Sequence, residues 1–159
     1  YFFEFEVGEK VENLDKAWLA GIIDGEGSIF VMKQKRNDRE RDTNYILRIS
    51  VDSTDPYMAK ECLKIAGGVQ ITQSSDKRPN CSDRLKWQIN GTQASRLLKE
   101  LLPYLRVKFY QAALAIEFQD TTKKHWRHMT KEDYESQASL YLQLKQAKLD
   151  LKLGKQIKE

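Results

Sequence analysis

The fold of this chain is indicated first by residues 19–27, which read LAGIIDGEG and are followed by Ser28 and Ile29. Apolar and small residues recur every three or four positions from Leu14 to Gly25, which predicts a helix. The opposite side of this helix is apolar as well, so both of its sides need to be covered. The sequence therefore predicts a helix that packs on its own domain with one side and needs a partner for the other.

Small residues lie four apart on one face of this helix, at Ala17, Gly21 and Gly25. Such a face lets the backbones of two identical helices approach closely, and here Trp18 and Ile22 flank it. Glu26 follows where the helix ends and a strand begins. Pairing two of these helices would therefore bring two Glu26 carboxylates together.

The rest of the chain predicts an antiparallel sheet with helices on one face, an α+β layer. In order we expect strands 28–36 and 44–52 around a polar turn at 37–42, and then a helix that starts at Asp55-Pro56 and ends at Gly67-Gly68. Strands 69–73 and 84–90 follow, then helices 93–102 and 105–119, and a last helix from 130 to near 154. Leu47, Ile49 and Val51 alternate with polar residues, which is typical of a strand with one buried face.

The other face of the sheet is predicted to stay open and to carry polar side chains that can contact bases and phosphates. These are Gln34, Arg36, Arg48, Ser50, Gln70, Thr72, Arg84, Lys86 and Gln88. The alternation along the first strand adds Ser28, Phe30 and Met32 to this face. A bulge that reversed the alternation would instead make Phe30 and Met32 core residues.

Length and composition favour one globular domain, because 159 residues with 40% hydrophobic content can bury a core. We expect an N-terminal extension at 1–12, the domain at 13–154 and a tail at 155–159.

The net charge of +4 includes −3 from residues 1–12, and five bases gather in residues 33–41, which favours a polyanionic partner. The sequence shows no membrane span or signal peptide, and its two cysteines indicate free thiols in a reducing, intracellular compartment.

The string LAGIIDGEG resembles the LAGLIDADG signature of homing endonucleases, with six of nine positions identical. The predicted order of helices and hairpins resembles that family's αββαββα fold from about Leu14 to Lys152. The resemblance implies an intron-encoded enzyme that cuts double-stranded DNA at a specific site. It would hydrolyse one phosphodiester per strand, with 5′-phosphates and short 3′ overhangs as products.

The resemblance also implies the site residues. Glu26 and the carbonyl of Gly25 would bind Mg²⁺, with Mn²⁺ able to substitute and Ca²⁺ supporting binding without cleavage. Lys108 corresponds to an active-site lysine, and Ser53 stands where the family often has a water-organising glutamine, a role that Asp52 could share. No membrane and no small-molecule cofactor is implied. Asp24 is interpreted as a helix-end residue, not a ligand.

A single copy of the motif implies a homodimer that pairs through Trp18, Gly21, Ile22 and Gly25 and reads a nearly palindromic site. Nine strand residues span roughly 30 Å, or about nine base pairs, so a dimer would read about 20 base pairs. A mitochondrion or chloroplast is compatible with such an enzyme. The alternatives are a maturase that binds intron RNA and a catalytically inactive DNA-binding protein of the same fold.

Overall fold

The computed structural model describes residues 9–35, 43–73, 84–122 and 128–154. The elements in chain order are α1 (Glu9–Gly25), β1 (Gly27–Lys35), β2 (Thr43–Ser53), α2 (Pro56–Ala66), β3 (Val69–Gln73), β4 (Arg84–Asn90), α3 (Gly91–Leu101), the 3₁₀ helix η2 (Leu102–Tyr104), α4 (Phe109–Thr121) and α5 (Lys131–Lys152). This order confirms the predicted α+β arrangement of helices and hairpins.

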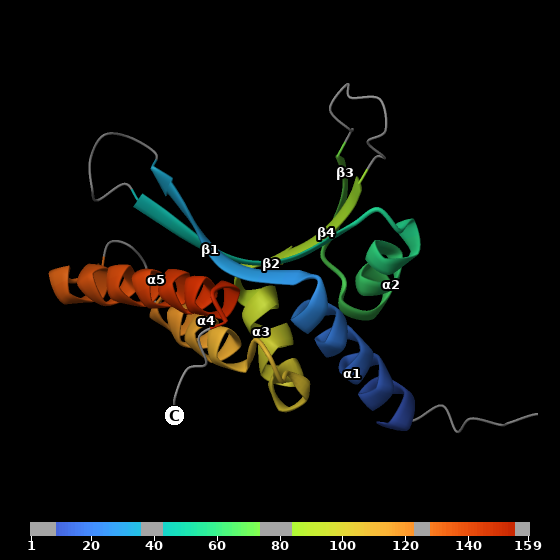
Figure 1. Ribbon diagram of the computed structural model, residues 1–159. Helices are drawn as coiled ribbons and strands as arrows, with labels where there is room; N and C mark the ends of the chain where they lie inside the picture. The colour runs from blue at the N-terminus through green and yellow to red at the C-terminus, as the bar shows by residue number, and fades with distance from the viewer. Residues whose placement is uncertain (1–8, 36–42, 74–83, 123–127, 155–159) are drawn as a thin grey trace, which may run out of the picture.

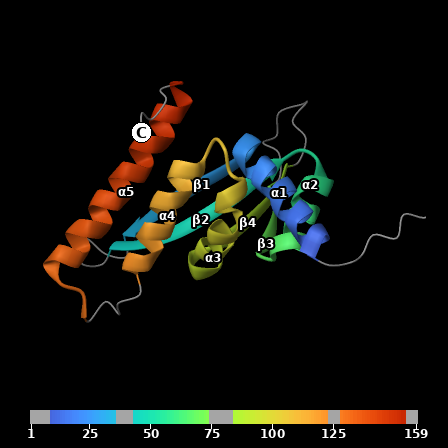
Figure 2. The same ribbon diagram turned by 90° about the horizontal axis from the view of Figure 1, so that it is seen from below.

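The strands form one antiparallel sheet in the order β1-β2-β4-β3. The sheet is curved, its concave side is open, and the helices lie on the other side (Figures 1 and 2). A saddle of this shape has one face for the core and one for an external ligand.

The alternation predicted for β2 decides which of its faces is buried. Leu47, Ile49 and Val51 are fully buried against the helices, together with Trp87 of β4 and Phe118 of α4. Each buried side chain of this size contributes about 1.5–3 kcal/mol. The helices are therefore held on the convex face by a continuous apolar layer.

Two helix starts form as the sequence predicts. The Asp55 carboxylate accepts a hydrogen bond of 2.9 Å from the Tyr57 N–H, and Pro56 begins α2. Thr130 and Asp133 form a complete capping box at the start of α5, with bonds of 3.2 and 2.9 Å.

Some boundaries differ from the prediction. Helix α1 begins at Glu9, inside the segment for which no element was predicted. Helix α4 begins at Phe109 and not at Leu105, because η2 and an extended residue at Leu105 precede it. The predicted turn at 37–42 lies outside the described residues. None of the described helices is long and apolar enough to span a membrane.

Candidate active site

Glu26 lies at the junction of α1 and β1, where a close packing contact fixes the backbone. A Cβ on Gly27 would lie 2.6 Å from the Ile23 Cα, so this position requires glycine. The Glu26 side chain is exposed and makes no hydrogen bond or ion pair with the described residues. Its carboxylate is therefore available to an external cation.

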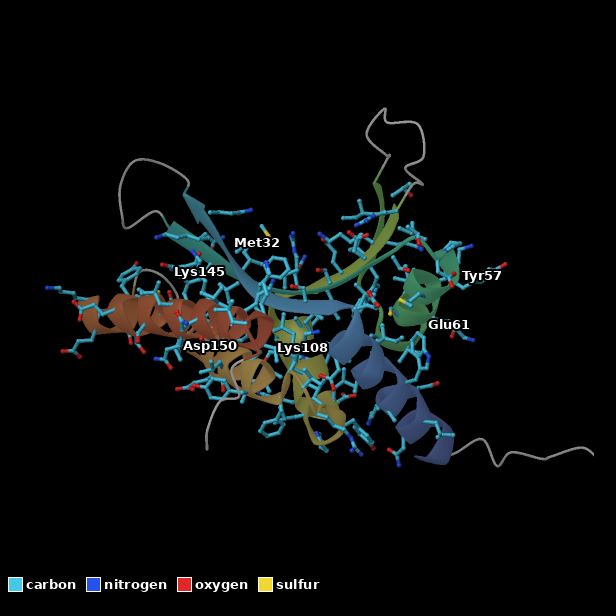
Figure 3. The ribbon with its side chains drawn as sticks, in the orientation of Figure 1. Met32, Tyr57, Glu61, Lys108, Lys145 and Asp150 are labelled. Carbon is cyan, nitrogen blue, oxygen red and sulfur yellow. The ribbon has the colours of Figure 1, made fainter. Side chains whose placement is uncertain are left out.

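Lys108 lies beside this junction, at the position preceding α4 (Figure 3). Its Nζ donates hydrogen bonds of 2.7 Å to the carbonyl oxygens of Ile23 and Asp24. Because an ammonium has three donors, one remains for a ligand. Burial lowers the pKa of Lys108, the charge of Lys148 lowers it further, and the carboxylates of Asp24 and Glu26 act in the opposite direction.

Asp24 connects the segment that carries Lys108 to the end of α1. One carboxylate oxygen accepts hydrogen bonds from the backbone N–H groups of Arg106 and Val107 at 2.8 and 3.2 Å. The other accepts a hydrogen bond of 2.9 Å from the backbone N–H of Lys108. This carboxylate is thus committed to backbone groups, which agrees with its interpretation as a helix-end residue. Its partners lie more than 80 residues away, so the sequence pattern did not predict them.

Asp52 and Ser53 lie at the end of β2 nearest Glu26. Gly27 pairs with Val51, so Glu26 and Asp52 are the next residues outward along the two strands. Asp52 approaches Arg84 at 3.7 Å, and its second carboxylate oxygen is buried without a partner. Ser53 Oγ accepts a hydrogen bond from the Asp55 N–H, so the structure shows it in the turn before α2. A water-organising role for either residue stays a prediction.

The strand register confirms the predicted facing of β1. Ile29 and Val31 are buried, and the alternating residues face the open side, where Figure 3 shows Met32. The open-face residues of β1, β2 and β4 that were predicted and are described are Ser28, Phe30, Met32, Gln34, Arg48, Ser50, Arg84, Lys86 and Gln88. Arg36 lies outside the described residues.

These open-face residues differ in accessibility. Ser50 and Gln88 pair across β2 and β4 and are less than a tenth exposed, so they offer little surface in the free chain. Arg48 is held by Asn90, which accepts a 2.8 Å hydrogen bond from its Nε. The two terminal nitrogens of Arg48 are directed by this contact, and Asn90 is a residue that the sequence did not single out.

The prediction for β3 was wrong. Gln70 pairs with Trp87 and Thr72 with Leu85, so both lie on the helix side of the sheet. Gly68 sets this register: its φ is +92°, and a Cβ there would lie 2.5 Å from the Gln88 carbonyl oxygen. The open face of β3 carries Val69 and Ile71 instead, which are 52% and 37% exposed.

The exposed side of α1 is the one predicted to meet a partner. Leu19, Ala20 and Ile23 are fully buried in the protomer. On the other side, Ala17, Trp18, Gly21 and Gly25 are exposed and Ile22 is half-buried. A Cβ at Gly21 or Gly25 would contact nothing within 4 Å, so the protomer itself requires neither glycine.

The comparison with protein families agrees with this geometry. A model described as LAGLIDADG endonuclease matches residues 19–125, from the motif in α1 to a point beyond α4. The chain belongs to the LAGLIDADG endonuclease family. Among the curated relatives of this LAGLIDADG chain is the DNA endonuclease I-CvuI of Chlorella vulgaris, 28% identical over 110 residues. The match covers 67% of this chain and 64% of I-CvuI, less than two thirds of that relative.

Solved structures of other homing endonucleases share the fold. I-CvuI bound to the I-CreI target DNA in the presence of magnesium, with the DNA not cleaved, matches with a TM-score of 0.72 and 21% identity, covering 86% of this chain and 83% of that one. The archaeal intron-encoded I-Vdi141I, complexed with DNA, matches with a TM-score of 0.70 and 14% identity, covering 86% and 85%. I-SmaMI bound to uncleaved DNA in the presence of calcium matches with a TM-score of 0.60 and 21% identity. This match covers 83% of this chain but 45% of I-SmaMI.

A single LAGLIDADG protomer supplies few metal ligands. Within the described ranges, no three His, Cys, Asp or Glu side chains gather to hold an ion. The Glu26 carboxylate lies where α1 ends, and the negative end of a helix dipole favours a cation there. Mg²⁺ suits such a site, because it binds through one or two carboxylates and completes its shell with water and substrate phosphates.

Proposed function

We propose that this protein is a site-specific DNA endonuclease that acts as a homodimer and hydrolyses one phosphodiester in each strand with Mg²⁺. The observation that carries the proposal is the exposed Glu26 carboxylate, without a partner among the described residues, beside Lys108 at the edge of an open concave sheet. Family membership and the DNA-bound state of I-CvuI and I-Vdi141I support it. An intron origin is part of the proposal and rests on the family resemblance.

Glu26, with the carbonyl of Gly25, is the group that would hold the metal in each subunit. Bound Mg²⁺ supplies Lewis-acid stabilisation of the phosphate and of the leaving oxygen. I-CvuI was solved with magnesium and with calcium, which supports divalent metal use here. We include Mn²⁺ as a substitute and Ca²⁺ as an ion that supports binding without cleavage.

Lys108 would act on the same phosphate through its remaining N–H. Two of its three donors hold the carbonyls of Ile23 and Asp24, so the ammonium is fixed before DNA arrives. A fixed charge stabilises the developing negative charge without reorganising in the transition state.

A second copy of the chain would complete the site. One protomer contributes one Glu26, and the exposed, glycine-bearing side of α1, which ends one residue before Glu26, is available for a two-fold contact. The I-SmaMI match supports pairing, because this chain corresponds to 45% of that longer chain. Two-fold symmetry would bring the two Glu26 carboxylates together and impose a nearly palindromic target.

The open face would read the DNA, with Arg48 as its best-defined contact. The Asn90 carbonyl oxygen holds Nε, which leaves the two terminal nitrogens to form a bidentate pair with guanine O6 and N7. Phe30 and Met32 supply apolar surface for thymine methyl groups. Gln34, Lys86 and Arg84 would add polar contacts to bases or phosphates.

Cleavage of a randomised plasmid library in Mg²⁺, followed by sequencing of the ends, tests the proposal. We expect one long, nearly palindromic site to be cut by the wild type. Glu26→Gln should still bind that site, but in Mg²⁺ it should cut it at least about a hundredfold more slowly than the wild type. The matched control is Glu61→Gln, an exposed acid of α2 outside the site, which should cut normally.

Three outcomes would contradict the proposal. The wild type could bind a site without cutting it in Mg²⁺, which would leave a DNA-binding protein. Preferential retention of structured intron RNA over duplex DNA would favour a maturase. Normal cutting by Glu26→Gln would remove the acid from the mechanism.

A further inference from the structure

Lys148 of α5 reaches the start of β1 and lies close to the proposed active site. Its Nζ donates a 2.6 Å hydrogen bond to Ser28 Oγ, two residues after Glu26. The same ammonium lies 5.2 Å from the centre of the Phe30 ring, within the range of a cation–π contact. Two contacts from one strand therefore hold this lysine at the edge of the open face.

The position of Lys148 places a second ammonium near Lys108. Burial lowers the pKa of Lys148, and the charge of Lys148 is one cause of the lowered pKa of Lys108. The nearby Asp24 carboxylate is committed to three backbone N–H groups. Two partly desolvated cations of this kind repel each other and are stabilised by an anion that reaches both.

The number of hydrogen-bond donors on the two lysines also allows for such an anion. An ammonium has three N–H donors, and Ser28 takes one of those on Lys148. Lys108 keeps one donor after its bonds to Ile23 and Asp24. Each of the two lysines, from α5 and from the start of α4, therefore keeps at least one donor for an anion.

We propose that Lys148 is a phosphate-binding residue of the active site, which contacts the DNA backbone next to the scissile phosphate and is positioned by Ser28. This inference rests on the proposed DNA-binding function. It assigns to α5, the helix farthest in sequence from the motif, a direct part in holding the substrate. The sequence offered no signal for it, because 120 residues separate Lys148 from Ser28.

The salt dependence of DNA binding tests this role, because each phosphate contact adds about 0.9 to the slope of log K against log salt. A homodimer that loses Lys148 loses two contacts, so the slope of Lys148→Gln should fall by about 1.8. Raising KCl from about 50 to about 200 mM should then lower the DNA affinity of Lys148→Gln about twelvefold less than it lowers that of the wild type. The probe is a labelled duplex selected by the wild type from a randomised pool, in Ca²⁺.

Lys131→Gln is the matched control. It removes the same charge from the same helix, about 25 Å away along the axis, where Lys131 forms an exposed ion pair with Glu135. Its slope should equal that of the wild type. Lys148→Arg keeps a cation and should restore most of the slope, which a purely structural role of the side chain would not explain.

The results separate this inference from the proposed function. A wild type that binds and cuts its site, with the same slope for Lys148→Gln, overturns the role of Lys148 alone. A wild type that neither binds nor cuts duplex DNA overturns the proposed function. Folding of each variant is checked by its melting temperature, and Lys148→Met, which also removes the charge and carries the same expected loss of slope, replaces Lys148→Gln if that variant unfolds.

Discussion

Replacing Asp24 with asparagine tests whether the end of α1 positions Lys108, the proposed active-site lysine. The carboxylate accepts three backbone hydrogen bonds, from Arg106, Val107 and Lys108, at 2.8 to 3.2 Å. An asparagine side chain has one acceptor oxygen, and its NH₂ group would face at least one N–H donor. The substitution therefore removes at least one bond and replaces the charged acceptor of the others by a neutral one.

The expected loss of stability follows from these bonds. A hydrogen bond to a charged group contributes about 1.5–3 kcal/mol and a neutral one about 0.5–1.5 kcal/mol. One lost bond and two weakened bonds would cost roughly 4 kcal/mol if fully buried. The bonds to Arg106 and Val107 are exposed, so water offsets part of this loss, and we expect about 2 kcal/mol.

Cleavage should fall together with stability, because the same bonds hold the backbone of Lys108. A displacement of about 1 Å can cost roughly a hundredfold in rate, and we expect at least a tenfold loss of cleavage by Asp24→Asn. Urea denaturation at a fixed protomer concentration measures the first effect, and single-turnover cleavage measures the second.

Asp55→Asn is the control for this prediction. The Asp55 carboxylate accepts one N–H, from Tyr57, and asparagine caps a helix about as well as aspartate. It should shift stability by less than about 0.5 kcal/mol and leave cleavage unchanged. Asp24→Asn with wild-type stability, or with wild-type cleavage despite its lower stability, would refute the reasoning about Lys108.

Three further predictions concern the subunit contact, the lysine and the core. Gly21→Leu places its side chain in open space on the protomer, so sedimentation should show protomers that stay folded but associate roughly tenfold to a hundredfold more weakly. Because burial lowers the pKa of Lys108, its charge and the cleavage rate should decline at a lower pH than for an ordinary lysine, whereas Lys108→Arg should keep cutting on the alkaline side. Burial raises the pKa of Cys62 to about 11, so in a Cys81→Ser background iodoacetamide at about pH 8.5 should modify Cys62 only after unfolding.

Much of the fold could be predicted because local patterns and tertiary structure agree in several elements. The alternation of Leu47, Ile49 and Val51 determines the buried face of β2, and the start of α5 follows from the capping box of Thr130. The exposure of the outer side of α1 could be predicted too. The helix is apolar on both sides, and the core of the protomer needs only one of them.

The register of β3 could not be predicted in this way. Five residues that read VQITQ alternate between apolar and polar, and the apolar ones were expected to be buried. The turn at Gly68 and the bond from the Trp87 indole N–H to the Gly67 carbonyl set the opposite facing. Backbone geometry thus outweighs the apolar preference of a short edge strand.

Contacts between distant segments of the chain could not be predicted from the sequence either. Asp24 joins residues 106–108, and Lys148 joins Ser28, through partners more than 80 residues apart. No periodicity encodes such pairs, because each depends on how whole helices pack. The resemblance proposed Glu26 and Lys108 as the acid and the lysine of the site, whereas the groups that position them required the structure.

The three bonds of Asp24 have a consequence for unequal pairs of subunits. They tie the backbone of Lys108 to the end of α1, next to Glu26, so the two residues of one protomer follow any tilt of its own α1 together. If this chain were joined to a foreign partner at an altered crossing angle, the two residues of each subunit would move together while the separation between the two subunits' sites changed. Such a chimera should then nick one strand faster than the other instead of losing both cuts together.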